Sequence, residues 1–441
     1  MNILLVMEQC NPQWASVPLL ASHFYRTIRE RVSVTLVTHE RNRSPLEKNR
    51  GTHRIIYIKE SSRLKRYYAH VSRITSSGGV NWPLQHALSY PVYAEFNRKV
   101  YDGFAKAVRA GQYDLVHVMT PILPRYPVKL VNACQNTPFL LGPVNGGVPF
   151  PRGEGFAAVA QKEFAQYNFL RLFTRLIPGY RATYKKADMI LSGSTYTKQW
   201  IEKQFQIPPG DDIVRLFHEN GVVPGNTDGV QFRRFRNGQD RPFHLLFVGR
   251  LVAYKGADIL LEALHRLTQK ARFESPDTSS SKVIQRPLSL TIVGDGPERQ
   301  NLENLTQKLG LTHIVHFTGW IKQEETRQYY ADADLFCFPS IREFGGAVAL
   351  EAMAFGLPCI TPDYAGLAEY VTPDTGFKIF PRSRNYLIEQ FAEKIAFLMA
   401  HPERLHQMAG HAVERVASYG WDQKADAMIA IYKQLINRKR P

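Results

Sequence analysis

Residues 334–362 read DLFCFPSIREFGGAVALEAMAFGLPCITP, and the order of apolar runs in this stretch indicates the fold class. It opens with an apolar run, DLFCFP, that we expect to be a strand, and it closes with a second run, PCITP. Between the two runs AVALEAMAF has helical character, and Gly356 followed by Pro358 supplies a stop signal for a helix. A strand, a helix and another apolar strand in this order indicate a parallel sheet that is covered by helices.

The same alternation continues on both sides of this stretch. The second half of the chain adds the strand candidates FHLLFVG, LSLTIVG and IVHFTG, and the first half has NILLVM, VSVTLVT, RIIYI, DLVHVM, PFLLGPV and DMILSG. Segments with helical character lie between them, among them residues 14–31, 61–112 and 157–186. Because the alternation occurs twice, the sequence predicts an α/β protein with two doubly wound, Rossmann-like domains.

We place the N-terminal domain at residues 1–225 and the C-terminal domain at residues 240–420. The stretch 221–243 between them is rich in Gly, Asn, Asp and Pro and lacks a helical period. A polar stretch at 273–287 is interpreted as an exposed insertion in the second domain. We expect the final helix, within residues 421–441, to pack back near the first domain.

The composition is that of a soluble globular protein, with 44% hydrophobic and 22% charged residues among 441. The four cysteines are widely spaced and form no C-x-x-C pair, which favours buried thiols in a reducing compartment. No apolar stretch is long enough to span a membrane. We therefore expect a cytoplasmic protein.

The positive charge is concentrated in the first half. Residues 1–240 hold 32 Lys and Arg against 17 Asp and Glu, whereas residues 241–441 hold 24 against 22. The first half should therefore attract anionic partners, such as the inner face of a membrane, to which the protein would bind peripherally. A solvated basic face, or a groove for a soluble acidic glycan, is the alternative. Two basic clusters carry much of this charge: Arg63, Lys65, Arg66 and Arg73, and then Arg171, Arg175, Arg181, Lys185 and Lys186.

The turn between DLFCFP and the following helix has the composition of a ligand site. Gly345 and Gly346 lie at a strand-to-helix turn at the carboxyl edge of the sheet, where backbone N–H groups and the helix N-terminus suit a phosphate. Glu343 precedes the turn, and Glu351 lies about one and a half helical turns after it. Carboxylates accept hydrogen bonds from hydroxyls. An anion combined with many hydroxyls describes a nucleotide sugar, although two solvated glutamates around a structural turn would give the same spacing.

Two further strand ends strengthen this interpretation. LLFVGRLVAYKG places Gly249, Arg250 and Lys255 after a strand, and two cations there can neutralise a diphosphate. LTIVGDGPE places Gly294 in a tight turn after another strand. All these residues fall at the same predicted edge of the second sheet.

The ordered set VGRLVAYKG, IVGDGPE, HFTGW and EFGGAVALEAMAFGLPCI resembles the family-four retaining glycosyltransferases, bacterial enzymes of polysaccharide and glycolipid synthesis. The resemblance is strong over residues 243–380 and looser over residues 1–220. It implies the GT-B fold, in which two Rossmann-like domains face a central cleft. It also implies transfer of a sugar, of hexosyltransferase type and with retained anomeric configuration, from a nucleotide diphosphate donor.

The resemblance also implies a role for each matching residue. Arg250 and Lys255 would hold the diphosphate, and Glu343 would contact hydroxyls of the donor sugar. Glu351 would bind the ribose hydroxyls. Phe344, Gly345 and Gly346 would line the sugar and the phosphate through their main chain. Gly319, Trp320 and Ile321 would lie near the base, and Gly249 and Gly294 would complete the donor site. Members of this fold need no bound metal, so no cofactor is expected. The residues Asp332 and Asp334 match a D-x-D metal-binding pattern, but they precede a strand and therefore lie at the wrong edge of the sheet for the site.

The first half departs from the family pattern. Its first loop, EQCNPQWASVP, lacks the glycine pair that many relatives carry, and no histidine matches the one that faces the donor sugar in relatives. The segment GPVNGG instead offers Asn145, Gly146 and Gly147 to the donor, or else forms a structural turn.

The sequence thus predicts a glycosyltransferase that uses a glycan or lipid-linked acceptor in cell-surface polysaccharide or glycolipid synthesis. Two alternatives are a sugar-nucleotide epimerase, which shares the fold, and a non-enzymatic, basic nucleic-acid-binding protein. The second alternative needs basic residues interleaved with aromatic ones, and RLKRYY at residues 63–68 has a little of this character. Because the paired glutamates argue against it, no nucleic-acid partner is expected.

Overall fold

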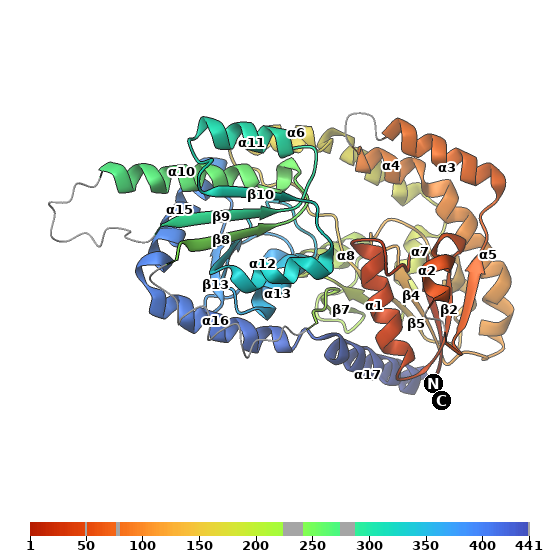
Figure 1. Ribbon diagram of the computed structural model, residues 1–441. Coiled ribbons are helices and arrows are strands. Elements are labelled where there is room, and N and C mark those ends of the chain that lie inside the picture. The colour runs from red at the N-terminus through yellow and green to blue at the C-terminus, as the bar shows by residue number, and fades with distance from the viewer. Residues whose placement is uncertain (49–50, 76–79, 224–240, 274–286, 440–441) are drawn as a thin grey trace. The chain divides into compact units, whose positions relative to one another are not determined.

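The computed structural model describes residues 1–48, 51–75, 80–223, 241–273 and 287–439. Most of the predicted domain boundary, 221–243, and most of the predicted insertion, 273–287, lie outside the described residues. The chain forms two compact units, each built around its own sheet (Figure 1). Unit 1 contains residues 1–148, 164–221 and 421–441, and unit 2 contains residues 149–163 and 222–420.

Unit 1 is built on a parallel sheet of seven strands in the order β3-β2-β1-β4-β5-β6-β7. Its strands are β1 (Asn2–Met7), β2 (Ser33–His39), β3 (Arg54–Ile58), β4 (Leu115–Thr120), β5 (Phe139–Val144), β6 (Met189–Ser192) and β7 (Val214–Leu216). Its α-helices are α1 (Val17–Arg29), α2 (Arg43–Glu47), α3 (Ser62–Thr75), α4 (Trp82–Leu88), α5 (Tyr90–Arg109), α7 (Tyr180–Lys185), α8 (Thr195–Phe205) and α17 (Trp421–Lys439). Short 3-10 helices are η1 (Glu40–Asn42), η2 (Lys129–Ala133) and η3 (Ala165–Leu176).

Apolar side chains on both faces of β1 and β4 explain why this sheet is buried between helices. In β4 every residue is buried, and alternate residues belong to two different core clusters, one on each face of the sheet. The last helix, α17, packs against α1, where Arg31 pairs with Asp422 and Asp426. Buried His117 on β4 is hydrogen-bonded to Tyr432 of α17 at 2.7 Å. His117 is therefore a structural residue that joins α17 to the sheet.

Unit 2 is built on a second parallel sheet, with six strands in the order β10-β9-β8-β11-β12-β13. Its strands are β8 (Phe243–Val248), β9 (Leu288–Val293), β10 (Val315–Gly319), β11 (Leu335–Cys337), β12 (Cys359–Pro362) and β13 (Gly376–Ile379). Its α-helices are α6 (Ala157–Lys162), α10 (Ala257–Phe273), α11 (Arg299–Lys308), α12 (Thr326–Asp332), α13 (Ala347–Ala354), α14 (Leu367–Tyr370), α15 (Arg384–Ala400) and α16 (Pro402–Ala417), and its 3-10 helices are η4 (Ala253–Lys255) and η5 (Gln323–Glu325).

The first domain was expected to contain all of residues 1–225, but the segment 149–163 belongs to unit 2. It leaves unit 1 after β5 and packs on unit 2, where a bridge joins Glu154 to Ser383 and the backbone N–H of Arg384 donates to Glu154 at 2.9 Å. The hydroxyl of Tyr364 donates to the carbonyl of Pro149 at 3.2 Å. These hydrogen bonds hold the segment on unit 2, although the residues before and after it in the sequence belong to unit 1.

Candidate functional site

The candidate site lies where the strand order of the second sheet reverses. β8 and β11 are neighbours, with β9 and β10 on one side of the pair and β12 and β13 on the other. In open parallel sheets, ligands bind outside the carboxyl ends of the strands at such a reversal. The loop after β8 carries Arg250 and Lys255, and the loop after β11 carries Glu343, Gly345 and Gly346. The structure therefore brings these predicted residues to one edge of the sheet.

Two glycines allow the loops to approach each other and their neighbours. Gly256 has a φ of 72°, and a Cβ there would lie 2.4 Å from the carbonyl oxygen of Pro339 in the other loop. Gly346 has a φ of 65° directly before α13, and a Cβ there would lie 2.8 Å from Leu367. Both positions require glycine. No side chain caps the N-terminus of α13, which is the end of a helix that favours anions.

Lys255 and Glu343 form an ion pair between the two loops. The Lys255 ammonium donates to the Glu343 carboxylate, and the side chains are only 13% and 18% exposed. The ammonium also lies 5.0 Å from the centre of the Phe338 ring. Burial acts to lower the pKa of Lys255, but the Glu343 carboxylate outweighs it, so that the pKa is raised. Lys255 is therefore a fixed positive charge at the sheet edge.

Glu351 is the fifth residue of α13, and both of its carboxylate oxygens accept hydrogen bonds. One oxygen accepts a hydrogen bond from the hydroxyl of buried Tyr330 at 2.9 Å, and the other accepts from the Gln323 side chain at 3.0 Å. Burial raises the pKa of Glu351, and the two hydrogen bonds oppose this. Because each oxygen of an ionised carboxylate has about two acceptor sites, the geometry leaves capacity for ligand hydroxyls.

Glu163, at the end of α6, lies against the loop that carries Arg250. Its carboxylate accepts hydrogen bonds from the backbone N–H groups of Ala253 and Tyr254, and both Arg250 and Arg342 attract it. Burial nevertheless raises the pKa of Glu163. Sequence reasoning missed Glu163 because its segment was assigned to the first domain. The Glu163 carboxylate thus occupies backbone N–H groups of the loop that was predicted to hold the diphosphate.

Arg342 is a second residue that the sequence reasoning missed, although it directly precedes Glu343. Its guanidinium lies 4.6 Å from the centre of the Phe150 ring and 5.4 Å from that of Phe344. Burial lowers the pKa of Arg342. Arg342 thus lies between Phe344, a predicted site residue, and the segment 149–163. The sequence had not indicated that this segment lies at the ligand edge of the second sheet.

The predicted donor-site residues Gly249, Gly294 and Gly319 lie at the ends of β8, β9 and β10. The backbone N–H of Gly249 donates to Val293 at 2.9 Å, and that of Gly294 donates to Gly319 at 3.0 Å. Trp320 follows directly and is 72% exposed, whereas Ile321 packs against the core of unit 2. An exposed indole at this edge offers a flat surface for a base, which stays a prediction.

Asn145, Gly146 and Gly147 belong to unit 1 and follow β5. Asn145 is 1% exposed, and its amide oxygen accepts hydrogen bonds from Ser194 at 3.0 Å and Thr197 at 2.9 Å. Its amide nitrogen donates to Glu219 at 2.7 Å. The side chain of Asn145 thus takes part in a network within unit 1, and a contact of this loop with the donor stays a prediction.

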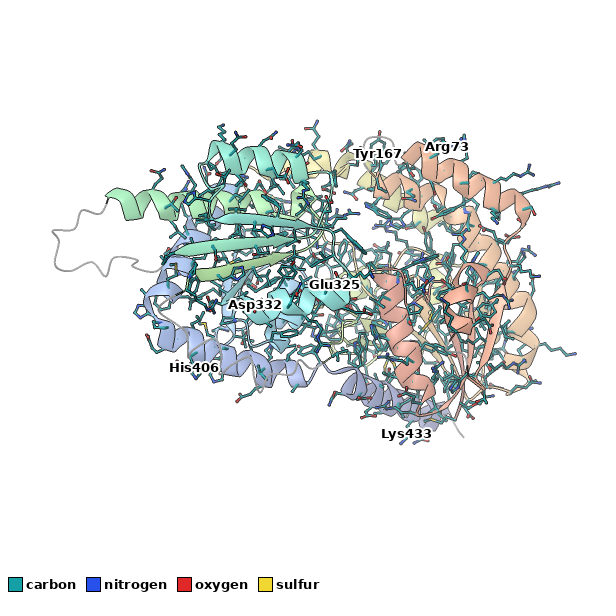
Figure 2. The ribbon with its side chains drawn as sticks, viewed as in Figure 1. Arg73, Tyr167, Glu325, Asp332, His406 and Lys433 are labelled. Carbon is teal, nitrogen blue, oxygen red and sulfur yellow. The ribbon has the colours of Figure 1, made fainter. Side chains whose placement is uncertain are left out.

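The D-x-D pattern lies at the opposite edge of the second sheet from the candidate site. Figure 2 shows Asp332 and Glu325 at opposite ends of α12. The Asp334 carboxylate accepts a hydrogen bond from the backbone N–H of His244, near the start of β8, at 2.9 Å. Within the described ranges, no group of three or more His, Cys, Asp and Glu side chains is arranged to hold a metal ion.

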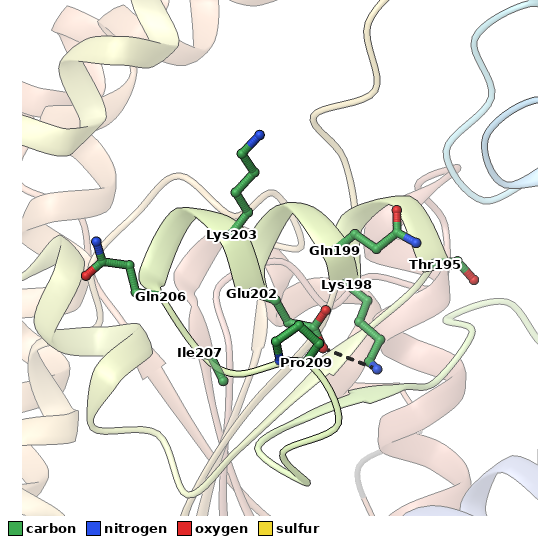
Figure 3. Close-up of a pocket in the computed structure, with 8 residues that line it drawn as sticks. All are labelled: Thr195, Lys198, Gln199, Glu202, Lys203, Gln206, Ile207 and Pro209. Atoms are coloured by element: carbon green, nitrogen blue, oxygen red, sulfur yellow. Dashed lines mark ion pairs between the residues drawn. The ribbon is translucent and has the colours of Figure 1, made fainter.

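A pocket in unit 1 involves none of the predicted residues. It lies along α8 and the loop that follows, beside an ion pair between Lys198 and Glu202 at 3.2 Å (Figure 3). Its lining residues are Thr195, Lys198, Gln199, Glu202, Lys203, Gln206, Ile207 and Pro209.

Comparison with known proteins shows a family likeness in the second half of the chain. Residues 230–415 match the sequence model of the family described as Glycosyl transferases group 1. This part of the chain is therefore similar to that family. The matched residues include Arg250, Lys255, Glu343 and Glu351.

Two relatives of the chain bear glycosyltransferase names. An uncharacterized glycosyltransferase of Methanocaldococcus jannaschii is 28% identical over 262 residues, which cover 58% of this chain and 62% of that protein. A D-inositol 3-phosphate glycosyltransferase of Catenulispora acidiphila is 30% identical over 250 residues, or 52% of this chain and 55% of that protein. The chain thus spans somewhat more than half the length of these relatives.

Solved structures extend the likeness to both units at the level of the fold. HepE of Anabaena, solved in complex with UDP, is similar with a TM-score of 0.60 and 16% identity, over 98% of this chain and 100% of HepE. The predicted GT-B fold with two Rossmann-like sheets is confirmed. In the described part of the chain, no helix has the length and apolar character needed to cross a membrane.

Proposed function

We propose that this protein is a retaining glycosyltransferase of hexosyltransferase type, which moves a sugar from a nucleotide diphosphate donor to a glycan or lipid-linked acceptor. One observation carries the proposal. Arg250, the Lys255–Glu343 pair and Glu351 lie together at the strand reversal of a group 1 domain. Cations for a diphosphate and carboxylates for hydroxyls are the two kinds of group that a nucleotide sugar requires.

The nucleotide part of the donor would lie along the edge of the second sheet. Support comes from HepE, a protein of similar fold that has been solved with UDP and with UDP-glucose. In this chain, the ribose hydroxyls would donate to Glu351, which Tyr330 and Gln323 hold in place. The base would lie against Trp320 and Ile321, beyond Gly319.

Charge separation in the transition state explains why cations are needed beside the diphosphate. As the bond from the sugar to the diphosphate breaks, negative charge grows on the leaving oxygen while the sugar becomes cationic. Arg250, Lys255 and the N-terminus of α13 would stabilise the leaving group more in the transition state than in the ground state. The positive charge comes from side chains, and we therefore expect no metal requirement.

Retention follows if bond breaking and bond making occur on the same face of the sugar. The acceptor oxygen forms the new bond to the anomeric carbon, the bond to the diphosphate breaks, and the acceptor proton passes to the departing phosphate. Glu343 would accept hydrogen bonds from donor-sugar hydroxyls and orient the anomeric carbon. This route needs no protein base.

A panel of nucleotide sugars tests the proposal. A donor that binds only the folded protein raises the melting temperature by mass action, and slow hydrolysis releases its nucleoside diphosphate. We expect one donor to do both, in the presence of chelator as well as in its absence. No stabilisation by any donor would overturn the proposal, and conversion of a donor into another nucleotide sugar would indicate an epimerase instead.

A further inference from the structure

Helix η3 of unit 1 presents an apolar stripe to solvent. Phe169, Leu172, Phe173 and Leu176 are 55%, 57%, 56% and 76% exposed. In a 3-10 helix, with about three residues per turn, Phe169 lies one turn from Leu172 and Phe173 lies one turn from Leu176, so the four side chains form two neighbouring rows. The rings of Phe169 and Phe173 lie 6.3 Å apart, centre to centre, in an edge-on arrangement. Four large apolar side chains so exposed and so close together mark an interaction surface.

Two neighbouring helices carry further exposed apolar side chains. α4 packs against both η3 and α3, and Figure 1 shows α3 and α4 lying side by side. Ile74 on α3 is 55% exposed, and Trp82 at the start of α4 is 42% exposed. We call the six residues Ile74, Trp82, Phe169, Leu172, Phe173 and Leu176 the apolar face.

Taken together, the three helices that carry the apolar face are basic, and they contain no acidic residue. α3 carries exposed Arg63, Lys65, Arg66 and Arg73, and Figure 2 labels Arg73 in the last turn of α3. Arg175 on η3 is exposed and donates to Gln204 at 2.6 Å. None of the residues of α3, α4 and η3 is Asp or Glu. The surface is therefore complementary to an anionic partner that also offers an apolar layer.

We propose that unit 1 docks on an anionic lipid bilayer through the apolar face, with the basic residues of α3 and η3 at the level of the headgroups. Helices with Trp, Phe and Leu on one side and Lys and Arg beside them lie in the membrane interface in this way. A nucleic acid or a soluble acidic glycan would satisfy the charge but would leave Leu172, Leu176 and Ile74 in water. The bilayer accounts for both observations. The docking surface does not depend on the proposed activity.

Vesicle co-sedimentation of the full chain, without any donor, tests the docking. We expect binding to vesicles of phosphatidylcholine with phosphatidylglycerol at low salt, and much weaker binding to phosphatidylcholine alone. High salt should weaken the binding because the Debye length falls from about 10 Å at 0.1 M to about 3 Å at 1 M. Equal binding to neutral and anionic vesicles, or no binding at low salt, would overturn the proposal.

Two variants with matched controls separate charge from insertion. Arg66→Glu should lower vesicle binding at least about fivefold, since one basic residue near an anionic surface contributes about that factor. Lys308→Glu, which makes the same charge change at an exposed end of α11 in unit 2, should not.

The double variant Leu172→Ser, Phe173→Ser should lower binding about tenfold or more, because it removes the apolar contribution. Leu216→Ser, at a 38% exposed apolar position on β7, should leave binding unchanged. Binding that survives in the double variant would show attraction by charge alone and would contradict insertion of the apolar face. All these positions are exposed, and melting temperatures close to that of the wild type would show that the variants fold.

Discussion

The Lys255–Glu343 pair governs the electrostatics of the candidate site. Both side chains are largely buried and each neutralises the other. A buried charge that loses its partner is costly, so removing Lys255 would both withdraw a cation and leave Glu343 unpaired beside the donor phosphates. Spacing in the sequence placed both residues at one sheet edge, but only the three-dimensional arrangement of the loops brings the two side chains into contact.

Glu351→Ala should weaken binding of the cognate nucleoside diphosphate. Hydrogen bonds to a charged acceptor contribute about 1.5–3 kcal/mol, which corresponds to roughly 10- to 150-fold in affinity. Titration calorimetry measures this. Tyr330→Phe is the control, because it removes one of the two hydrogen bonds that hold Glu351 but keeps the carboxylate. Unchanged affinity in a folded Glu351→Ala protein would remove this residue from the nucleotide site.

Glu163→Gln should tighten nucleoside diphosphate binding. The Glu163 carboxylate accepts hydrogen bonds from the backbone N–H groups of Ala253 and Tyr254, and it attracts Arg250. A diphosphate bound at this loop would therefore be repelled by the negative charge of Glu163. Removing the charge should lower the dissociation constant severalfold, by about 1 kcal/mol. Calorimetry with the same nucleotide checks it. Weaker binding in the variant would mean that Glu163 instead holds Arg250 in position for the donor.

Glu8 should make the stability of the protein depend on pH. Burial raises the pKa of this half-buried residue after β1 from 4.5 to about 7. Between these values the folded state binds more protons than the unfolded state, so stability falls as the pH rises. Glu8→Gln should therefore gain stability relative to the wild type between pH 5 and pH 8, by at most about 3 kcal/mol.

This prediction is checked by measuring the melting temperatures of the wild type and of Glu8→Gln at pH 5 and at pH 8. Glu389→Gln, on the surface of α15, is the control substitution. If the difference in melting temperature between Glu8→Gln and the wild type is the same at pH 5 and pH 8, Glu8 does not titrate as described.

At the scale of elements, strands with apolar residues on both faces were predictable from sequence. The runs NILLVM and RIIYI coincide with β1 and β3, and FHLLFVG and LSLTIVG contain β8 and β9. In a parallel sheet such strands are buried by helices on both sides, so their composition carries a strong signal. The strands β7 and β13 were not predicted. β7 has three residues, of which one is buried, and β13 has four, of which two are buried, so neither forms a clear apolar run.

Segments whose position depends on tertiary contacts were not predictable. Residues 149–163 join unit 2 through backbone hydrogen bonds, ring contacts and Phe156, which is buried in the core of unit 2. Composition gives no signal for which of two cores such a short segment joins. The stretch 165–176 was expected to be helical and forms a 3-10 helix, and Pro178 and Gly179 separate it from α7 as their backbone preferences indicate. That its apolar side chains face solvent was visible only in the structure.

Gly346→Ala should destabilise the turn before α13. A non-glycine residue at φ 65° is strained, and its Cβ would come within 2.8 Å of Leu367. We expect a loss of about 1–2 kcal/mol in stability, together with reduced turnover as the turn shifts. Gly410→Ala is the matched control, because it lies in α16 with no atom within 4 Å of its Cβ. It should stabilise the protein by about 0.5–1 kcal/mol. Equal melting temperatures for the two variants would contradict this account of the turn.

At the scale of the whole molecule, the two units have related topology, and the two halves of the sequence carry very different charge. Both sheets are parallel and reverse their strand order once near the centre, between β1 and β4 and between β8 and β11. The first 240 residues nevertheless carry a net charge of +15, from 32 basic and 17 acidic residues, whereas residues 241–441 carry +2, from 24 and 22. The nearly neutral half holds the candidate donor site, and the basic half holds the proposed membrane surface.

The rate of nucleoside diphosphate release from the cognate donor measures how much Arg250 and Lys255 contribute to sugar transfer. It should be compared in the wild type, Arg250→Ala, Lys255→Ala and Lys308→Ala. We predict that the first two variants lose at least about 100-fold in kcat/KM, and lose less in affinity for the nucleoside diphosphate, because the leaving group gains charge in the transition state. Lys308→Ala should match the wild type. Wild-type kcat/KM in a folded Arg250→Ala or Lys255→Ala protein would contradict the account.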